Sequence, residues 1–324
     1  MPTRPIFIFS LPRAGSTLLQ RMLSTHEDIN TKSELWFLLP HVEALKSRYT
    51  FSWYSNLSLE NATRSLLEQL PHGEDDYYRA IRALGDSLYE SLARNGERYV
   101  LDKTPRYYLI INDIVKIYPD AKFIFLFRNP LSVAASIVES FNRGRLGDFR
   151  HKIDLYLGSR LLAEGYESIK DHSIVVHYEK LVVEPQHVLE KVCTYLDIPF
   201  HSGLVSSFAE TPVGVFGDQF GSAKFTALEP GRMENWRRVF STTFRQRYLL
   251  KYLRDIGRGP IETFGYDFDD LQAQVANMEV QFSTGMRDRY NLLKCEIMSL
   301  FEGIVFREKI LRHGKLSSKT YMLH

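Results

Sequence analysis

The apolar residues of this chain gather in short continuous runs, each followed by a stretch with helical spacing. The runs cover residues 6–9, 122–127 and 173–177 and are rich in β-branched and aromatic side chains, and residues 99–105 have the pattern of a short strand closed by a turn. Such runs are typical of strands buried on both faces of a parallel sheet. Apolar residues then recur three and four positions apart over 16–23, 107–118, 130–141 and 185–196. This alternation predicts an α/β fold with a mostly parallel central sheet flanked by helices.

Two further regions have helical periodicity without strands between them. Apolar spacing between about residues 35 and 96 predicts a helical insertion over the sheet. Beyond the glycine-rich stretch 257–265, spacings of three, four and seven predict an amphipathic helical tail, with breaks near Gly285 and Gly303. We therefore expect a main domain over residues 1–268 and a helical C-terminal extension over 269–324. The extension packs on its own domain or joins two copies of the chain.

Composition narrows the class of protein. The chain has 324 residues, of which 44% are hydrophobic and 25% charged, as in ordinary globular proteins. Its 41 Lys and Arg nearly balance 39 Asp and Glu, which argues against a nucleic-acid partner. Two cysteines are too few for a disulfide framework and fit a reducing compartment. No run approaches the roughly 20 apolar residues of a membrane span, and no signal-peptide pattern is visible, so we expect a cytoplasmic protein.

The loop between the first strand and the first helix has the chemistry of an anion site. Residues 10–17 read Ser-Leu-Pro-Arg-Ala-Gly-Ser-Thr. The free N–H groups and the dipole of a helix N-terminus favour an anion, and the loop adds a cation and two hydroxyls. It departs from the Walker pattern, because the first glycine is absent and a serine replaces the lysine. We predict that a phosphate is held by Arg13, Ala14, Gly15, Ser16 and Thr17; the alternative is an ordinary turn with a capping serine.

A second cation stands at the end of the third predicted strand. A nucleoside triphosphatase is expected to have an acidic residue there to hold Mg²⁺, whereas this chain has Arg128. A cation indicates a second phosphate and not a metal. Ser136 follows eight residues later, in the next helix, and its hydroxyl is placed to face the same group. The alternatives are a surface cation and a small residue at a helix contact.

Together these motifs resemble the sulfotransferase family over roughly residues 6–266. The resemblance also includes Val-His-Tyr-Glu-Lys-Leu at 176–181 and Tyr-Leu-Asp-Ile-Pro at 195–199. That family uses 3′-phosphoadenosine-5′-phosphosulfate (PAPS) and releases adenosine 3′,5′-bisphosphate (PAP). The resemblance implies that residues 13–17 bind the 5′-phosphosulfate and that Arg128 and Ser136 bind the 3′-phosphate. It also implies that Tyr178 lies near the adenine, and that residues 1–268 form the catalytic domain.

A late cofactor segment of the family is only partly matched. In cytosolic members it reads R-K-G-x-x-G-D-W-K, whereas residues 229–237 here read Glu-Pro-Gly-Arg-Met-Glu-Asn-Trp-Arg. The glycine and the tryptophan are kept, but the Arg-Lys pair is missing. We assign Lys224 and Arg232 as its replacements, and the alternative is that both are solvated surface cations.

The catalytic residues implied by the resemblance follow the protein-tyrosine branch of the family. The cytosolic branch has a histidine base in K-T-H-x-P, which is missing from Lys-Thr-Pro at 103–105. The protein-tyrosine branch has a glutamate about twenty residues beyond the loop arginine, and Glu34 stands 21 residues after Arg13. Glu34 is thus implied as the general base, with Lys103 on the sulfuryl oxygens and Arg13 on the bridging oxygen. The alternative for Glu34 is a carboxylate at a helix N-terminus.

The resemblance implies an enzyme that transfers a sulfuryl group from PAPS to a hydroxyl by in-line displacement, without a metal. Two alternatives stay open: a P-loop kinase, which needs Mg²⁺ and ATP, and a catalytically silent PAP-binding scaffold. The acceptor is a small molecule, a carbohydrate or another hydroxyl compound. The aromatic residues between 36 and 89 either stack on that acceptor or form the core of the insertion.

Overall fold

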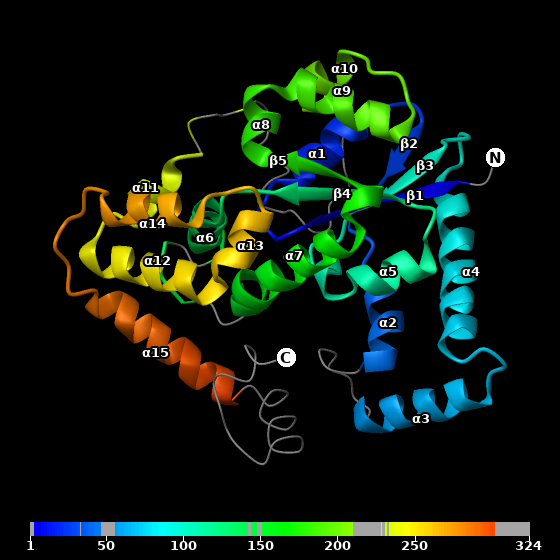
Figure 1. Cartoon of the computed structure of the whole chain (residues 1–324), viewed down its shortest axis with the longest axis horizontal. Coiled ribbons are helices and arrows are strands. Elements are labelled where there is room, and N and C mark those ends of the chain that lie inside the picture. The colour runs from blue at the N-terminus through cyan, green and yellow to red at the C-terminus, as the bar shows by residue number, and fades with distance from the viewer. Residues whose placement is uncertain are drawn as a thin grey trace.

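Five parallel strands form one sheet at the centre of the molecule (Figure 1). The computed structural model describes residues 3–32, 34–46, 56–141, 144–147, 151–209, 228, 231 and 233–301. The strand order is β2-β3-β1-β4-β5. The strands are β1 (Arg4–Ser10), β2 (Ile29–Thr31), β3 (Tyr99–Asp102), β4 (Lys122–Phe127) and β5 (Ser173–His177). The predicted α/β class and the four predicted strands are confirmed, and β2 was not predicted from the sequence.

The central strands are apolar on both faces because both faces carry a core. Along β1, Phe7 and Phe9 enter one hydrophobic cluster, while Ile6 and Ile8 enter the other, and all four are fully buried. Successive side chains of a strand point to opposite faces, so a continuous apolar run supplies two cores at once. A sheet of this kind requires helices on both sides.

The helices divide between the two faces (Figure 1). One face is covered by α1 (Ser16–Leu23), α8 (Tyr178–Val183), α9 (Pro185–Leu196) and α10 (Gly203–Ser206). The opposite face carries α5 (Ile111–Ile117), α6 (Pro130–Ser140), α7 (Gly158–Ile169), α11 (Asn235–Val239), α12 (Thr243–Ile256) and α13 (Arg258–Thr263). A 3-10 turn, η1 (Tyr107–Leu109), precedes α5, a π-helical turn, η3 (Ile153–Leu157), precedes α7, and another 3-10 turn, η4 (Lys170–His172), follows it. The helix predicted over 107–118 is therefore divided at Ile110, whose ψ of 24° is not helical.

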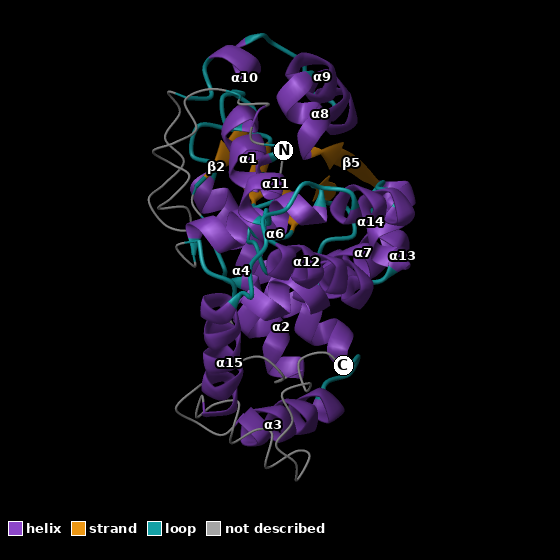
Figure 2. Ribbon diagram, turned by 90° about the vertical axis from the view of Figure 1, so that its left-hand side faces the viewer, coloured by secondary structure: helices purple, strands orange, loops and turns teal. Residues whose placement is uncertain are grey.

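The predicted helical insertion is present between β2 and β3. It consists of α2 (Leu38–Lys46), α3 (Asn56–Gln69) and α4 (Glu74–Leu92). Figure 2 shows α3 at the end of the molecule that lies away from the sheet. On the inner side of α4, Tyr78, Ile81 and Tyr89 are buried in the same core as the sheet residue Phe7. The insertion thus extends the core on one face of the sheet.

The described part of the C-terminal region, up to residue 301, contains two helices, α14 (Phe268–Ala276) and α15 (Met286–Phe301). Leu271 and Val275 of α14 are buried in the main core. The break predicted near Gly285 is present, since Gly285 has a φ of +66° and α15 starts directly after it, whereas Gly303 lies outside the described residues. The division at residue 268 stays a prediction. None of the helices in the described part of the chain has the length and apolarity needed to cross a membrane.

Candidate active site

The residues predicted to carry chemistry follow the five strands in the order of the sheet. Glu34 comes after β2, Lys103 after β3, Arg13 after β1, Arg128 after β4 and Tyr178 after β5. The carboxyl ends of parallel strands meet at one edge, where binding sites of open α/β sheets form. All five residues line one cavity of about 770 Å³ at this edge. Residues from opposite halves of the sequence therefore share a single site.

The loop between β1 and α1 has an unusual backbone and lies against Tyr178, the first residue of α8. Arg13 and Gly15 both have positive φ values, 68° and 103°. A Cβ on Gly15 would lie 2.3 Å from Cδ2 of Tyr178, so the ring leaves room only for glycine. Ser16 and Thr17 line the cavity at the start of α1, where the first N–H groups have no partner inside the helix. Ala14 is buried and is not part of the lining.

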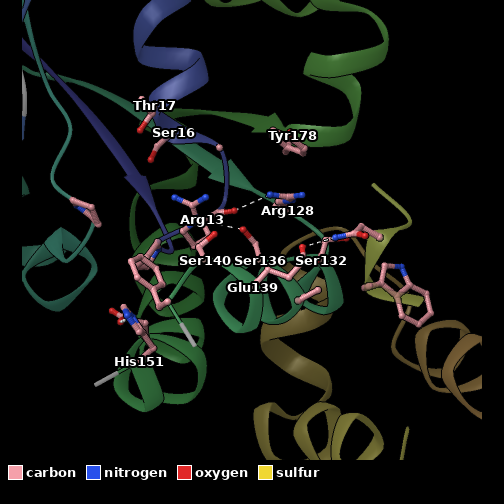
Figure 3. Close-up of a pocket in the computed structure, with 18 of the residues that line it drawn as sticks. Arg13, Ser16, Thr17, Arg128, Ser132, Ser136, Glu139, Ser140, His151 and Tyr178 are labelled. Atoms are coloured by element: carbon pink, nitrogen blue, oxygen red, sulfur yellow. Dashed lines mark hydrogen bonds and ion pairs between the residues drawn. The ribbon is translucent and has the colours of Figure 1, made fainter. Parts of the chain in front are cut away.

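Arg128 lies in the wall of the cavity and supports this loop (Figure 3). Its Nη1 donates to the carbonyl of Arg13 at 2.8 Å, and its guanidinium stacks over the ring of Tyr178 at 4.2 Å. Burial lowers the pKa of Arg128 from its ordinary value. Its Nε is buried and has no hydrogen-bond partner among the described residues. Because an unmatched buried donor is costly, this atom fits an anion that enters the cavity.

Ser136 faces the same cavity but contacts Arg13. The Nε of Arg13 donates to the Ser136 hydroxyl at 3.2 Å, and the Arg13 guanidinium lies 5.7 Å from the centre of the Phe141 ring. Figure 3 shows Arg13 and Ser136 next to one another, with Ser136 on α6. Arg128 thus binds the carbonyl of Arg13, and Ser136 binds its guanidinium.

Glu34 and Lys103 form a buried ion pair. Lys103 Nζ lies 2.8 Å from Glu34 Oε1, and the two side chains are 3% and 6% exposed, respectively. The indole Nε1 of Trp36 donates to the other oxygen, Oε2, at 3.0 Å. Each carboxylate oxygen therefore accepts one hydrogen bond. The alternative interpretation of Glu34 is wrong, because α2 begins at Leu38, four residues further along.

A second buried carboxylate lines the cavity and was missed by the sequence analysis. Asp154 accepts from Nε and Nη2 of Arg106, both at 3.2 Å, and from the Tyr108 hydroxyl at 2.6 Å. His151 Nδ1 lies 3.0 Å from the same carboxylate, and its ring stacks on Phe141 at 4.2 Å. Burial opposes ionisation, but the hydrogen bond from His151 and the Arg106 charge lower the pKa of Asp154. Only Arg106 stands near a predicted motif, so periodicity offered no signal for this group.

The opposite wall is built where α11 packs on α6. The Ser132 hydroxyl donates to the carbonyl of Met233 at 2.8 Å, and Glu139 of α6 pairs with Arg238 of α11. Trp236 is fully buried in this wall, and its Nε1 has no hydrogen-bond partner among the described residues. Arg238 was also missed, although it follows the tryptophan of the predicted late segment. Lys224 and Arg232 lie outside the described residues, and their role stays a prediction.

The lining carries more positive than negative charge. It contains five Lys and Arg side chains and three carboxylates, an excess of two positive charges among the described lining residues. Each of the three carboxylates, Glu34, Glu139 and Asp154, forms an ion pair with a different cation. The other two cations of the lining, Arg13 and Arg128, lie at the loop between β1 and α1 and at the end of β4. A ligand with several negative charges fits this end of the cavity.

No group of three or more His, Cys, Asp or Glu side chains that could hold a metal ion occurs in the described part of the chain.

The chain is similar to a nodulation protein and to a protein-tyrosine sulfotransferase. It is 28% identical over 257 residues to nodulation protein NoeE of Sinorhizobium fredii (strain NBRC 101917 / NGR234), and 26% identical over 246 residues to the protein-tyrosine sulfotransferase of Drosophila melanogaster. Each match covers 71% of this chain. The matches span 59% of the length of the first relative and 45% of the length of the second.

A solved structure and a family model agree with these relatives. The sulfotransferase domain of the Synechococcus PCC 7002 olefin synthase superposes with a TM-score of 0.51 at 26% identity, covering 82% of this chain and 96% of that domain. A model of the sulfotransferase family matches residues 5–202, which contain the whole sheet except its first residue, Arg4, and the loop between β1 and α1. Because this match extends over more than half of the chain, the chain belongs to the sulfotransferase family.

Proposed function

We propose that this protein transfers a sulfuryl group from PAPS to the hydroxyl of a small-molecule or carbohydrate acceptor. The observation that carries the proposal is the cavity at the carboxyl edge of the sheet. An excess of two positive charges lies there beside a buried Glu34–Lys103 pair. The excess positive charge matches a doubly phosphorylated nucleotide, and the Glu34–Lys103 pair matches a general base next to a cation.

The residues present fit the nucleotide. The unmatched Nε of Arg128 supports contact with the 3′-phosphate, and the nearby Ser136 hydroxyl supports the same end. Residues 13–17 supply a helix N-terminus and two hydroxyls for the 5′-phosphosulfate. The stack of Arg128 on Tyr178 places an aromatic ring beside this region, where an adenine can pack.

The chemistry at the other end of the site is proton removal and charge stabilisation. PAPS supplies an activated sulfuryl group with a phosphate as the leaving group. Glu34 accepts the proton of the acceptor hydroxyl as that oxygen attacks in line with the leaving group. Lys103 donates to the sulfuryl oxygens, and Arg13 donates to the bridging oxygen as negative charge grows on it. All three side chains line the same cavity, which supports these roles.

A binding measurement tests the nucleotide. Calorimetry compares PAP with 5′-AMP and with Mg-ATP, and is repeated with Arg128→Ala. We expect PAP to bind most tightly and the substitution to weaken it about 30-fold or more, because a buried charged contact is lost. Arg258→Ala, which removes an exposed arginine on α13, is the charge-matched control and should bind PAP as the wild type does. Preference for Mg-ATP would support a kinase instead.

A transfer measurement tests the catalytic residues. Labelled PAPS is offered with a panel of phenols, sugars and aliphatic alcohols, and sulfated product is counted for wild type and Glu34→Gln. We expect Glu34→Gln to lower kcat about 10²- to 10⁴-fold, the usual contribution of a general base, with PAP affinity unchanged. A full rate in Glu34→Gln would overturn the assignment of the base. Tight PAP binding without transfer to any hydroxyl would support the silent scaffold.

A further inference from the structure

A fully buried carboxylate lies directly behind the active site without lining it. Asp102, the last residue of β3, is 0% exposed and is not part of the cavity wall. The hydroxyls of Tyr89 and Tyr107 both donate to its Oδ2 at 2.9 Å, and the Thr104 hydroxyl donates to Oδ1 at 3.3 Å. A buried carboxylate is costly unless hydrogen bonds satisfy it, and three hydroxyls do so here. Asp102 is therefore a fixed acceptor that the proposed chemistry does not use.

Thr104 connects this carboxylate to Trp36. The Thr104 hydroxyl has one proton, which goes to Asp102, so its oxygen is left to accept. The backbone N–H of Trp36 donates to that oxygen at 3.2 Å. Trp36 has a φ of +59°, a conformation that is strained for a bulky residue and needs support from its surroundings. The Thr104 hydroxyl provides such support at the strained residue itself.

Trp36 in turn holds the proposed base. Its indole Nε1 donates to Oε2 of Glu34, while Lys103 occupies Oε1. In the proposed reaction, Lys103 also serves the sulfuryl oxygens, so the indole is the donor that keeps a constant position on the carboxylate. A shift of about 1 Å in a catalytic group can lower a rate about 100-fold. The position of the indole is consequently important for the rate.

We propose that Thr104, anchored by Asp102, is a positioning residue that orients the Glu34 carboxylate through Trp36. This inference rests on the proposed role of Glu34 as the base. Thr104 does not touch the reacting atoms, and its effect passes through one backbone N–H and one indole N–H. Removal of its hydroxyl releases the left-handed turn at Trp36 and lets the carboxylate leave its place.

The first test requires neither PAPS nor an acceptor. The chain has three tryptophans, so the ¹⁵N spectrum of the labelled protein contains three indole N–H signals, and Trp36→Phe identifies one of them. We expect Thr104→Val to move that signal, Thr104→Ser to restore it, and Glu34→Gln to move it as well. Thr194→Val makes the same change on α9, where the hydroxyl bonds to the carbonyl of Glu190, and should leave it in place. An unchanged Trp36 signal in a folded Thr104→Val protein would overturn the proposal.

The second test separates this inference from the proposed function. With the best hydroxyl of the transfer panel, Thr104→Val should lower kcat about 10- to 100-fold while PAP affinity stays unchanged. Thr104→Ser should recover the rate, and Thr104→Val should have no further effect in a Trp36→Phe background, because the connection is already broken. A rate lost in Glu34→Gln but kept in Thr104→Val would refute the positioning role alone. A rate kept in Glu34→Gln would refute the base.

Discussion

The buried carboxyl of Asp102 should make the stability of the protein depend on pH in a defined direction. Burial raises its pKa from 3.8 to about 6, and the hydroxyls of Tyr107, Tyr89 and Thr104 limit the rise. The folded chain therefore prefers the protonated form of Asp102. This preference stabilises the folded state fully below a pH of about 4, and the stabilisation is lost as pH rises through about 6. At 1.36 kcal/mol per pKa unit, the full change is about 3 kcal/mol. About 2 kcal/mol of it falls between pH 4.5 and 7.5.

Asp102→Asn removes this titration and keeps an acceptor oxygen in place. The free energy of unfolding of the variant minus that of wild type should therefore rise by about 2 kcal/mol from pH 4.5 to pH 7.5. Urea unfolding at several pH values measures it, and equal m values show that both proteins unfold to the same extent. A difference that is constant with pH, or that falls as pH rises, would show that Asp102 is not a high-pKa carboxyl.

Asp120→Asn is a control of opposite sign. Partial burial alone would raise the pKa of Asp120, but the hydrogen bond from Arg82 lowers it. A lowered pKa stabilises the folded chain above the ordinary pKa, and that contribution is lost as pH falls. Relative to wild type, Asp120→Asn should therefore lose stability as pH rises toward about 4, near the ordinary pKa of 3.8, and stay nearly constant from pH 4.5 to pH 7.5, where Asp102→Asn gains stability.

Three further substitutions follow from the same contacts. Lys103→Ala leaves the Glu34 carboxylate buried without its cation, so the free energy of unfolding measured in urea should fall by about 3 to 5 kcal/mol. The double variant with Glu34→Gln should lose clearly less stability, and equal losses would contradict the pairing. Gly15→Ala forces an L side chain at a φ of +103°, so the free energy of unfolding should fall by about 1 to 3 kcal/mol, and calorimetry should show weaker PAP binding. Unchanged binding would show that the loop does not need glycine. Tyr107→Phe removes a hydroxyl from Asp102, so its pKa should rise further; the pH-dependent change in unfolding should move to higher pH, and a change at the wild-type pH would argue against this bond.

Local pattern determined the elements and part of the site. Continuous apolar runs rich in β-branched and aromatic residues are typical of strands buried on two faces, which is why the strands at 6–9 and 122–127 were predicted from local sequence. The loop at 10–17 and Arg128 were also found from sequence, because each directly follows such a run and parallel strands bring their carboxyl ends together. The roles of Glu34 and Lys103 came from resemblance to a family and not from spacing.

The tertiary structure decided which distant residues meet. Glu34 and Lys103 are 69 positions apart, and they pair because β2, a strand of three residues, lies beside β3. A strand of three residues is too short to show periodicity. The sequence alone therefore did not reveal that β2 lies beside β3. The left-handed Trp36 donates its N–H to a hydroxyl that follows another strand, and Asp154 is bound by Arg106 and Tyr108, which lie 48 and 46 positions earlier in the chain. Periodicity reports which face of an element is apolar, whereas hydrogen bonds between segments depend on the order of strands in the sheet.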